Sequence, residues 1–145
     1  MKVVINNCYG GFSLSPLGSQ RYLELTGQPF YCYKQTKFKH SNGRAEFTRI
    51  DDINEAPNIF FYCTIVDQGK IISDFPKHTF NSRNIKRTDP YLIQVVEELG
   101  SKASGGCAAL EVVEIENGRW FKIDEYDGLE TIQYRDIDDE WILAE

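Results

Sequence analysis

The feature that most restricts the fold is a short amphipathic helix predicted over residues 89–100, with the sequence DPYLIQVVEELG. Asp89 is a favourable N-cap, and Pro90 suits the first helical position because no backbone N–H is needed there. Gly100 is a typical helix terminator. The apolar residues follow the i, i+3, i+4, i+7 spacing of one helix face, and they are Leu92, Val95, Val96 and Leu99. The segment therefore predicts a helix that buries a single face.

A second helix and several strands are predicted around it. Ser15 and Pro16 are a start signal for a helix that ends near Gly27. Residues 34–56 are polar and predicted to be irregular, with Asn42-Gly43 as a turn. Residues 59–66, IFFYCTIV, are the most apolar run and are predicted to form a central strand. Other apolar runs predict strands at residues 3–7, 29–33, 109–115, 120–124 and 129–134.

Short turn signals predict how these strands connect. Residues 67–69 are predicted to join the strand at 59–66 to a hairpin partner at 70–72. Residues 116–118 contain Asn-Gly, the strongest short hairpin signal, and predict a hairpin between residues 109–115 and 120–124. Asp127-Gly128 predicts a further turn. This order predicts an α+β fold, with a mainly antiparallel sheet and two helices, in a single domain over residues 1–145.

The composition restricts the class of partner. The net charge is −6, whereas proteins that grip DNA or RNA polymers gain affinity by neutralising phosphates with a basic face. The sequence has no apolar run of the roughly 18 residues that a membrane span needs. Its first apolar run, Val3-Val4-Ile5, is too short for a signal peptide. We therefore expect neither nucleic-acid polymer nor membrane as a partner, and a cytoplasmic location.

The residues that most often bind metals or catalyse reactions show no recognisable spacing. The four cysteines at positions 8, 32, 63 and 107 form no C-x-x-C pair, and the two histidines lie far from them in sequence. Free thiols in a reducing compartment are expected. No nucleophile elbow or H-E-x-x-H motif is present, and Asp124, Glu125 and Asp127 are interpreted as surface charge. The sequence therefore favours a binding protein without metal or cofactor over an enzyme.

Three segments are candidates for holding an anion. The turn YGGFS, residues 9–13, lies between a predicted strand and a predicted helix, where glycines allow close backbone approach. Arg83, Lys86 and Arg87 directly precede the second helix. The loop ASGG, residues 103–106, again consists of small residues. Each segment has a structural alternative, namely a tight turn, solvated charge, or a plain helix-to-strand connection.

Three blocks taken together resemble a family of small phage proteins, the first Thoeris anti-defence family; they are VVINNCYGGFSLS, KRTDPYLIQVVEELGSKASGG and LEVVEIENGRWFKIDEYDGLE. Proteins of that family bind and sequester the cyclic ADP-ribose isomers made by bacterial TIR-domain enzymes. The resemblance implies that this chain holds such a signal unmodified in an infected bacterial host and blocks Thoeris immunity. It also implies a homo-oligomer, in which dimers build a hexamer. Some members hold cyclic oligonucleotides at a separate site.

The resemblance places the ligand region at the YGGFS turn, at residues 87–90 and at the ASGG loop. The chain has Gly106 where the family often has an arginine, and Asp89 where the family sometimes has an asparagine. Another cation, Arg83 or Arg87, is then needed to meet the pyrophosphate.

The chemistry of a cyclic ADP-ribose suggests roles for the side chains. The adenine needs an aromatic face, for which Tyr9, Phe12 and Phe80 are candidates. The phosphates need donors, the arginines and the glycine-turn N–H groups, and the ribose hydroxyls need polar partners. The predicted ligand-binding residues are Asn7, Tyr9, Gly10, Gly11, Phe12, Ser13, Phe80, Asn81, Arg83, Arg87, Asp89, Ser104 and Gly105.

Two other functions stay open from the sequence. One is an enzyme that degrades a nucleotide signal. The other is a protein-interaction module that inhibits a host factor through an acidic face, since the C-terminal residues 136–145 are rich in acids.

Overall fold

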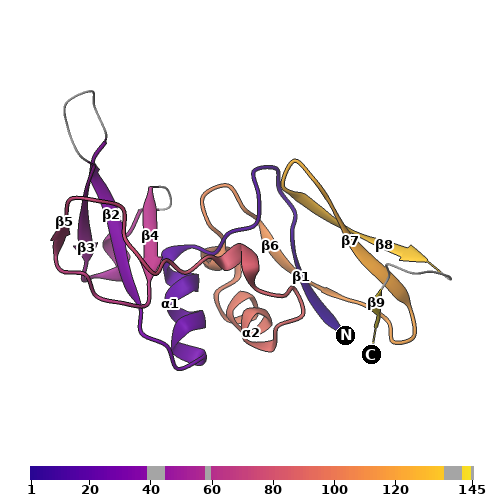
Figure 1. The fold of residues 1–145 in the computed structure, drawn as a ribbon. Helices are drawn as coiled ribbons and strands as arrows, with labels where there is room; N and C mark the ends of the chain where they lie inside the picture. Colours follow the sequence, from indigo (N-terminus) through magenta and orange to yellow (C-terminus); the bar gives the residue numbers. More distant parts are fainter. Residues whose placement is uncertain (39–44, 58–59, 136–141, 145) are drawn as a thin grey trace.

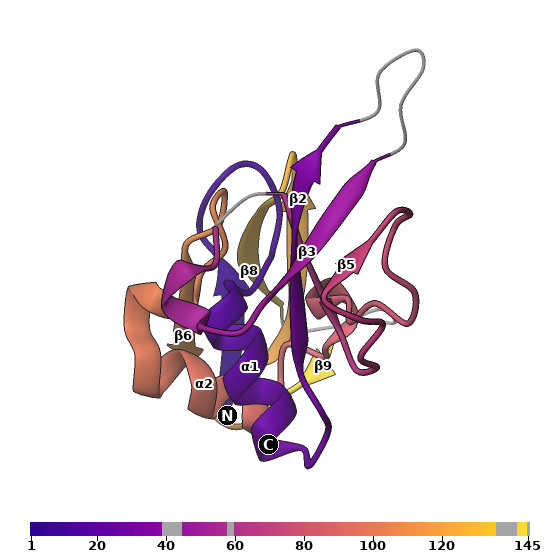
Figure 2. The same ribbon diagram turned by 90° about the vertical axis from the view of Figure 1, so that its left-hand side faces the viewer.

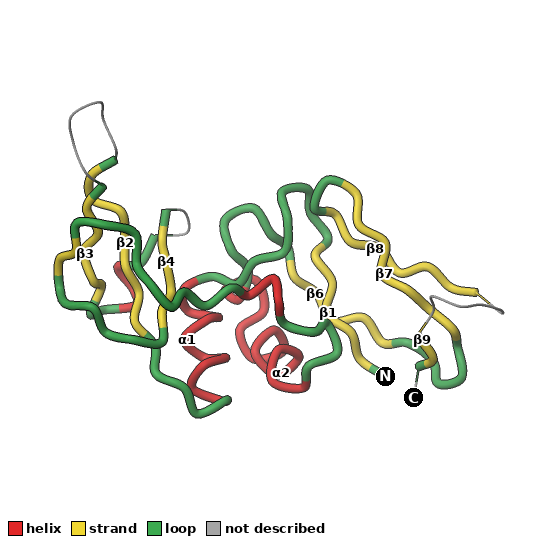
Figure 3. The backbone as a smooth tube through the Cα atoms, viewed as in Figure 1, coloured by secondary structure: helices red, strands yellow, loops and turns green. Residues whose placement is uncertain are grey.

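The computed structural model describes residues 1–145 except 39–44, 58–59, 136–141 and 145. In these described residues, two α-helices lie in the middle of an elongated molecule, with strands at both ends (Figures 1 and 3). Every strand pair is antiparallel, which confirms the predicted α+β class. The elements are β1 (Lys2–Asn6), α1 (Pro16–Leu25), β2 (Tyr31–Lys37), β3 (Glu46–Ile50), η1 (Ile53–Glu55), β4 (Phe61–Thr64), β5 (Ile71–Ile72), η2 (Ser82–Asn84), α2 (Pro90–Leu99), η3 (Gly100–Ala103), β6 (Leu110–Glu114), β7 (Trp120–Tyr126), β8 (Leu129–Arg135) and β9 (Ile142–Leu143).

Both predicted helices are confirmed, with the caps that the sequence indicates. At α1, the Ser15 hydroxyl accepts a hydrogen bond from the Gly18 backbone N–H at 3.0 Å. At α2, the Asp89 carboxylate accepts hydrogen bonds from the N–H groups of Tyr91 and Leu92. These bonds satisfy backbone donors that a helix start otherwise leaves without partners. None of the described helices has the length and apolar character needed to cross a bilayer.

The first strand explains how the helices connect to the C-terminal sheet. β1 pairs with β6 in a two-stranded sheet, and residues 3–6 of β1 are buried. Val4 packs with the apolar faces of the two helices, whereas Val3 and Ile5 pack with Phe121 of β7 on the opposite side. The unbroken apolar run at residues 3–5 therefore reflects burial on both faces of one strand.

The four-stranded sheet at the other end has the order β4-β2-β3-β5 and faces the viewer in Figure 2. Three predictions were wrong here. Residues 34–56 contain a strand, β3, and only Phe47 of that strand is fully buried, so its apolar pattern is weak. β4 lies at the edge of the sheet and not at its centre, and residues 78–80 bond to its outer side. β5 pairs with β3 and not with β4. The predicted Asn42-Gly43 turn and residue 59 lie outside the described residues.

The third sheet has the order β8-β7-β9. Asp127 and Gly128 form the two-residue turn between β7 and β8, as predicted, with φ angles of 49° and 88°. The hairpin predicted at Asn117-Gly118 was wrong. The chain turns there, but β6 pairs with β1 while β7 pairs with β8 and β9. The apolar β1 competes for the β6 edge, and a local turn signal contains no information about such a distant partner.

Candidate functional site

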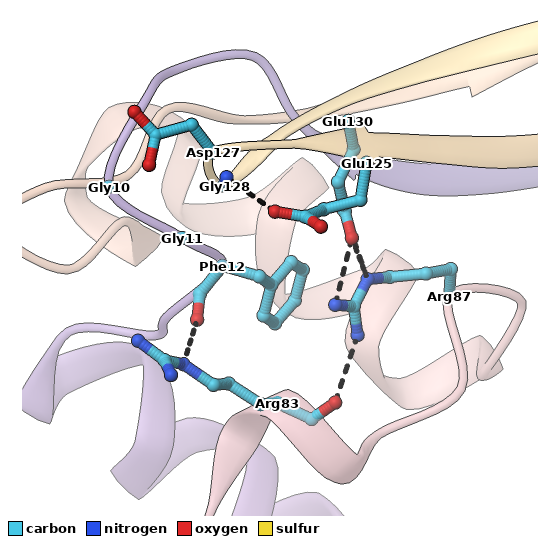
Figure 4. A pocket seen from close by; sticks show the side chains of 9 residues that line it. All are labelled: Gly10, Gly11, Phe12, Arg83, Arg87, Glu125, Asp127, Gly128 and Glu130. Atoms are coloured by element: carbon cyan, nitrogen blue, oxygen red, sulfur yellow. Dashed lines mark hydrogen bonds and ion pairs between the residues drawn. The ribbon is translucent and has the colours of Figure 1, made fainter.

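A pocket of about 420 Å³ lies where the turn after β1 meets the β7–β8 hairpin and the segment before α2 (Figure 4). We call it the hairpin pocket. Its volume falls within the range of about 300–1,000 Å³ that is typical of small-molecule sites. The lining residues are Gly10, Gly11, Phe12, Arg83, Arg87, Glu125, Asp127, Gly128 and Glu130.

The double glycine packs against the tip of the β7–β8 hairpin. Gly10 and Gly11 have φ angles of 112° and 98°, which strongly favour glycine. The Gly10 N–H donates to the Asp127 carbonyl at 3.0 Å. A Cβ atom at Gly128 would overlap the backbone nitrogen of Gly11. The backbone angles and the close packing against the hairpin tip therefore explain why this turn contains glycines, and the same packing forms one wall of the pocket.

A buried ion pair forms the opposite wall. The Arg87 guanidinium binds the Glu130 carboxylate, with Nη2 to Oε2 at 3.0 Å, and the two side chains are only 16% and 9% exposed. Its Nη1 also donates to the Ile85 carbonyl at 2.8 Å. The guanidinium carbon lies 3.6 Å from the centre of the Phe12 ring. Arg87 is thus engaged with protein groups, so its main role in this structure is to hold the pocket wall.

Of the two arginines that line the hairpin pocket, Arg83 is the one that remains available. Its Nε donates to the Phe12 carbonyl at 3.3 Å, and Gly11 lies directly beside its Nη2. No ion pair among the described residues includes Arg83, whose side chain is exposed at the pocket rim. Among the described residues, no hydrogen-bond acceptor is found for the backbone N–H groups of Gly11 and Phe12, although Gly128 packs against the Gly11 nitrogen. A forked guanidinium donor of this kind is suited to phosphate oxygens.

Carboxylates that the sequence analysis assigned to surface charge also line the pocket. Glu125 accepts a hydrogen bond from the Gly128 N–H, and Asp127 lies at the hairpin tip (Figure 4). Carboxylates of this kind accept hydrogen bonds from hydroxyl groups. The hairpin residues were missed because a contact between residues 10–12 and 125–130 is long-range and has no local sequence signal.

A second space, the β4 cavity of about 230 Å³, lies between β4 and the segment before α2. Ser13, Phe80, Asn81 and Arg83 line it, so Arg83 lies between the two spaces. Asn81 caps η2 by accepting a hydrogen bond from the Arg83 N–H. The Phe80 ring stacks on the Tyr22 ring, with the ring centres 5.6 Å apart. One face of Phe80 is therefore already covered by a protein ring.

The other predicted site residues lie outside the hairpin pocket. Asp89 caps α2 and also accepts a hydrogen bond from the Tyr22 hydroxyl at 2.8 Å. Burial, followed by this hydrogen bond, raises the pKa of Tyr22 to about 12. Ser104 accepts a hydrogen bond from the Leu110 N–H, and the Gly105 N–H donates to the Ser13 carbonyl. These three residues fasten the loops around α2.

The remaining residues that were predicted to contact the ligand differ in how exposed they are. Phe12 is only 3% exposed and its ring carries the Arg87 guanidinium, so this ring offers no free face to a base. Tyr9, by contrast, is 58% exposed beside the glycine turn. Asn7 is exposed, and its backbone N–H donates to Ala109. Asn6, which the sequence analysis did not select, is fully buried and bonds Ala109, Cys8 and Gly128 through its side chain.

Within the described part of the chain, no group of three or more histidine, cysteine, aspartate or glutamate residues is arranged to hold a metal ion. No protein-family model matches the sequence, and no curated protein or solved structure matches it at a significant level.

Proposed function

We propose that this chain binds a cyclic ADP-ribose signal made by a TIR-domain enzyme and sequesters it without cleavage, which suppresses Thoeris immunity in the infected bacterial cytoplasm. The observation that carries the proposal is Arg83, an exposed guanidinium without a carboxylate partner among the described residues, at the rim of a 420 Å³ pocket. The three sequence blocks that resemble the anti-defence family also contribute the two glycines and the hairpin of this pocket.

The lining groups match the parts of such a ligand. Arg83 is a forked donor for the pyrophosphate. Glu125 and Asp127 are acceptors for ribose hydroxyls. Because these carboxylates repel free phosphate, the pocket is better suited to a ligand that presents phosphate and hydroxyl groups together. Tyr9 offers an exposed aromatic surface next to the turn.

We further propose that the chain acts as a dimer-based homo-oligomer, as the resemblance implies. In support, Trp120, Tyr126 and Leu143 lie on the same face of the C-terminal sheet, opposite to the face of the buried Phe121, and all three are substantially exposed. Exposed apolar groups that gather on one face of a sheet are typical of a surface that contacts another protein. A native mass spectrum of the liganded protein reports the subunit count and the ligand mass together.

Heat release tests sequestration against turnover. The protein is incubated with a cyclic ADP-ribose isomer, freed of unbound nucleotide by filtration, and denatured by heating. We expect the nucleotide to appear unchanged in the supernatant, in an amount proportional to the protein. A cleaved product, formed in excess over the protein, would instead support the enzyme. Absence of any retained nucleotide, for every isomer and for cyclic oligonucleotides, would support a protein-interaction module.

A further inference from the structure

Two buried cysteines lie directly opposite each other in the N-terminal sheet. Cys32 of β2 and Cys63 of β4 are register partners, and their exposed fractions are 1% and 4%. The Gln35 N–H donates to the Phe60 carbonyl, so Gln35 directs its backbone groups toward β4. This direction alternates along a strand, so the backbone groups of Cys32 point away from β4. The Cys63 carbonyl accepts from the Phe80 N–H on the outer side. Cys32 and Cys63 therefore form a non-hydrogen-bonded pair.

This type of pair brings two cysteines within bonding reach. Residues of a non-hydrogen-bonded antiparallel pair have Cα atoms about 4.5 Å apart, with their side chains close together. A disulfide requires Cα separations of about 4.4–6.8 Å. The neighbouring Cys63 thiol lowers the pKa of Cys32, whereas the contact with Cys32, followed by burial, raises the pKa of Cys63. Little backbone movement is needed to join the sulfurs.

We propose that Cys32 and Cys63 are a modification site, at which a hydroperoxide converts the two thiols to a reversible disulfide between β2 and β4. One thiol attacks the O–O bond and becomes a sulfenic acid, with release of water or an alcohol. The second thiol attacks the sulfenic sulfur, forms the S–S bond and releases water. Two electrons thus pass from the sulfurs to the peroxide, and a small dithiol reverses the reaction. Cys63 lines the β4 cavity, which gives a small oxidant a route to the pair.

The disulfide would link β4, an edge strand, covalently to β2, and β4 is hydrogen-bonded to the segment that leads to Arg83. β4 and the residue that follows it bind this segment: the Phe80 N–H donates to the Cys63 carbonyl, and the Ile65 N–H donates to the His78 carbonyl. The chain then enters η2, which contains Arg83. Oxidation therefore constrains the segment that leads into η2 and Arg83. The strand pairing alone brings the two cysteines together, whether or not the chain binds the proposed ligand.

Mass spectrometry of the full-length chain tests the site. A C8S/C107S variant retains only Cys32 and Cys63, and treatment with hydrogen peroxide should lower its mass by the mass of two hydrogen atoms. The disulfide should raise the melting temperature by about 5–15 °C, and a dithiol should reverse both changes. The same variant carrying C32A should show neither change.

Peptide mapping of the wild-type protein decides the question even if the variants fold poorly. We expect a disulfide-linked peptide pair that contains Cys32 and Cys63. Cys107 is exposed and reports that the oxidant has acted. If Cys107 is oxidised while Cys32 and Cys63 both remain free thiols, the proposal is overturned.

Discussion

Replacing Arg87 with alanine is expected to lower the free energy of unfolding by about 3–5 kcal/mol, since it leaves a buried carboxylate without its counter-ion. The Glu130 side chain is 9% exposed, and its carboxylate accepts three hydrogen bonds from the Arg87 guanidinium and one from the Asn6 N–H at 3.0 Å. The substitution also removes the cation from the Phe12 ring and the donor to the Ile85 carbonyl. Urea unfolding followed by tryptophan fluorescence measures the change.

A matched arginine and a second-site variant separate this effect from a general loss of charge. Arg21 also forms ion pairs, with Glu24 and Glu98, but they are at the surface and should contribute little. Arg21→Ala should therefore unfold close to the wild type. Adding Glu130→Gln to Arg87→Ala should recover part of the lost stability, because a neutral amide is less costly to bury. Equal effects of Arg87→Ala and Arg21→Ala would contradict the role assigned to the buried pair.

Gly128→Ala is expected to lower the free energy of unfolding by about 2–5 kcal/mol, the combined cost of a strained backbone and of overpacking. Gly128 has a φ of 88°, and an added Cβ would overlap the nitrogen of Gly11 and approach that of Gly10 to 2.7 Å. The hairpin tip must then move away from the glycine turn. The same unfolding measurement, together with amide exchange of the turn residues, would detect the displacement.

Gly118→Ala is the control that measures the cost of the strained backbone alone. Gly118 has a similar φ of 84°, but an added Cβ would meet no atom within 4 Å. Its substitution should cost only about 1 kcal/mol. The difference between the two variants measures the contact between the hairpin tip and the double glycine. If both variants lose the same stability, that contact contributes nothing and the pocket wall is not held in this way.

The sequence predicted those elements whose signals are local. Capped helices at Ser15 and Asp89 and the Asp127-Gly128 hairpin were all predicted correctly, because caps and turns depend on a few neighbouring residues. Strand partners were predicted less well. β6 pairs with β1 across more than a hundred residues, and β3 is a strand although most of its residues are polar. Such pairings are decided by packing on distant elements, which periodicity within one segment does not encode.

The same distinction applies to the candidate site. The structure brings Gly10, Gly11, Phe12, Arg83 and Arg87, all selected from the sequence, to one pocket. The two arginines differ, because Arg83 is available to a ligand whereas Arg87 is engaged with protein groups. Glu130 engages Arg87, and this acid was not among the predicted residues. Asp89, which was predicted to meet a sugar, is engaged by the α2 N-terminus and Tyr22. A residue type can indicate which chemistry is possible, whereas its partners decide whether it is available.

Calorimetric titration of the wild type, Arg83→Ala and Arg21→Ala with a cyclic ADP-ribose isomer tests the central claim most directly. A charge-assisted hydrogen bond contributes about 1.5–3 kcal/mol, so Arg83→Ala should bind roughly 10–150-fold more weakly. Arg21→Ala should bind like the wild type, and both variants should retain the wild-type melting temperature. Undiminished affinity in folded Arg83→Ala, or no heat of binding in the wild type, would contradict the assignment of the hairpin pocket as a nucleotide site.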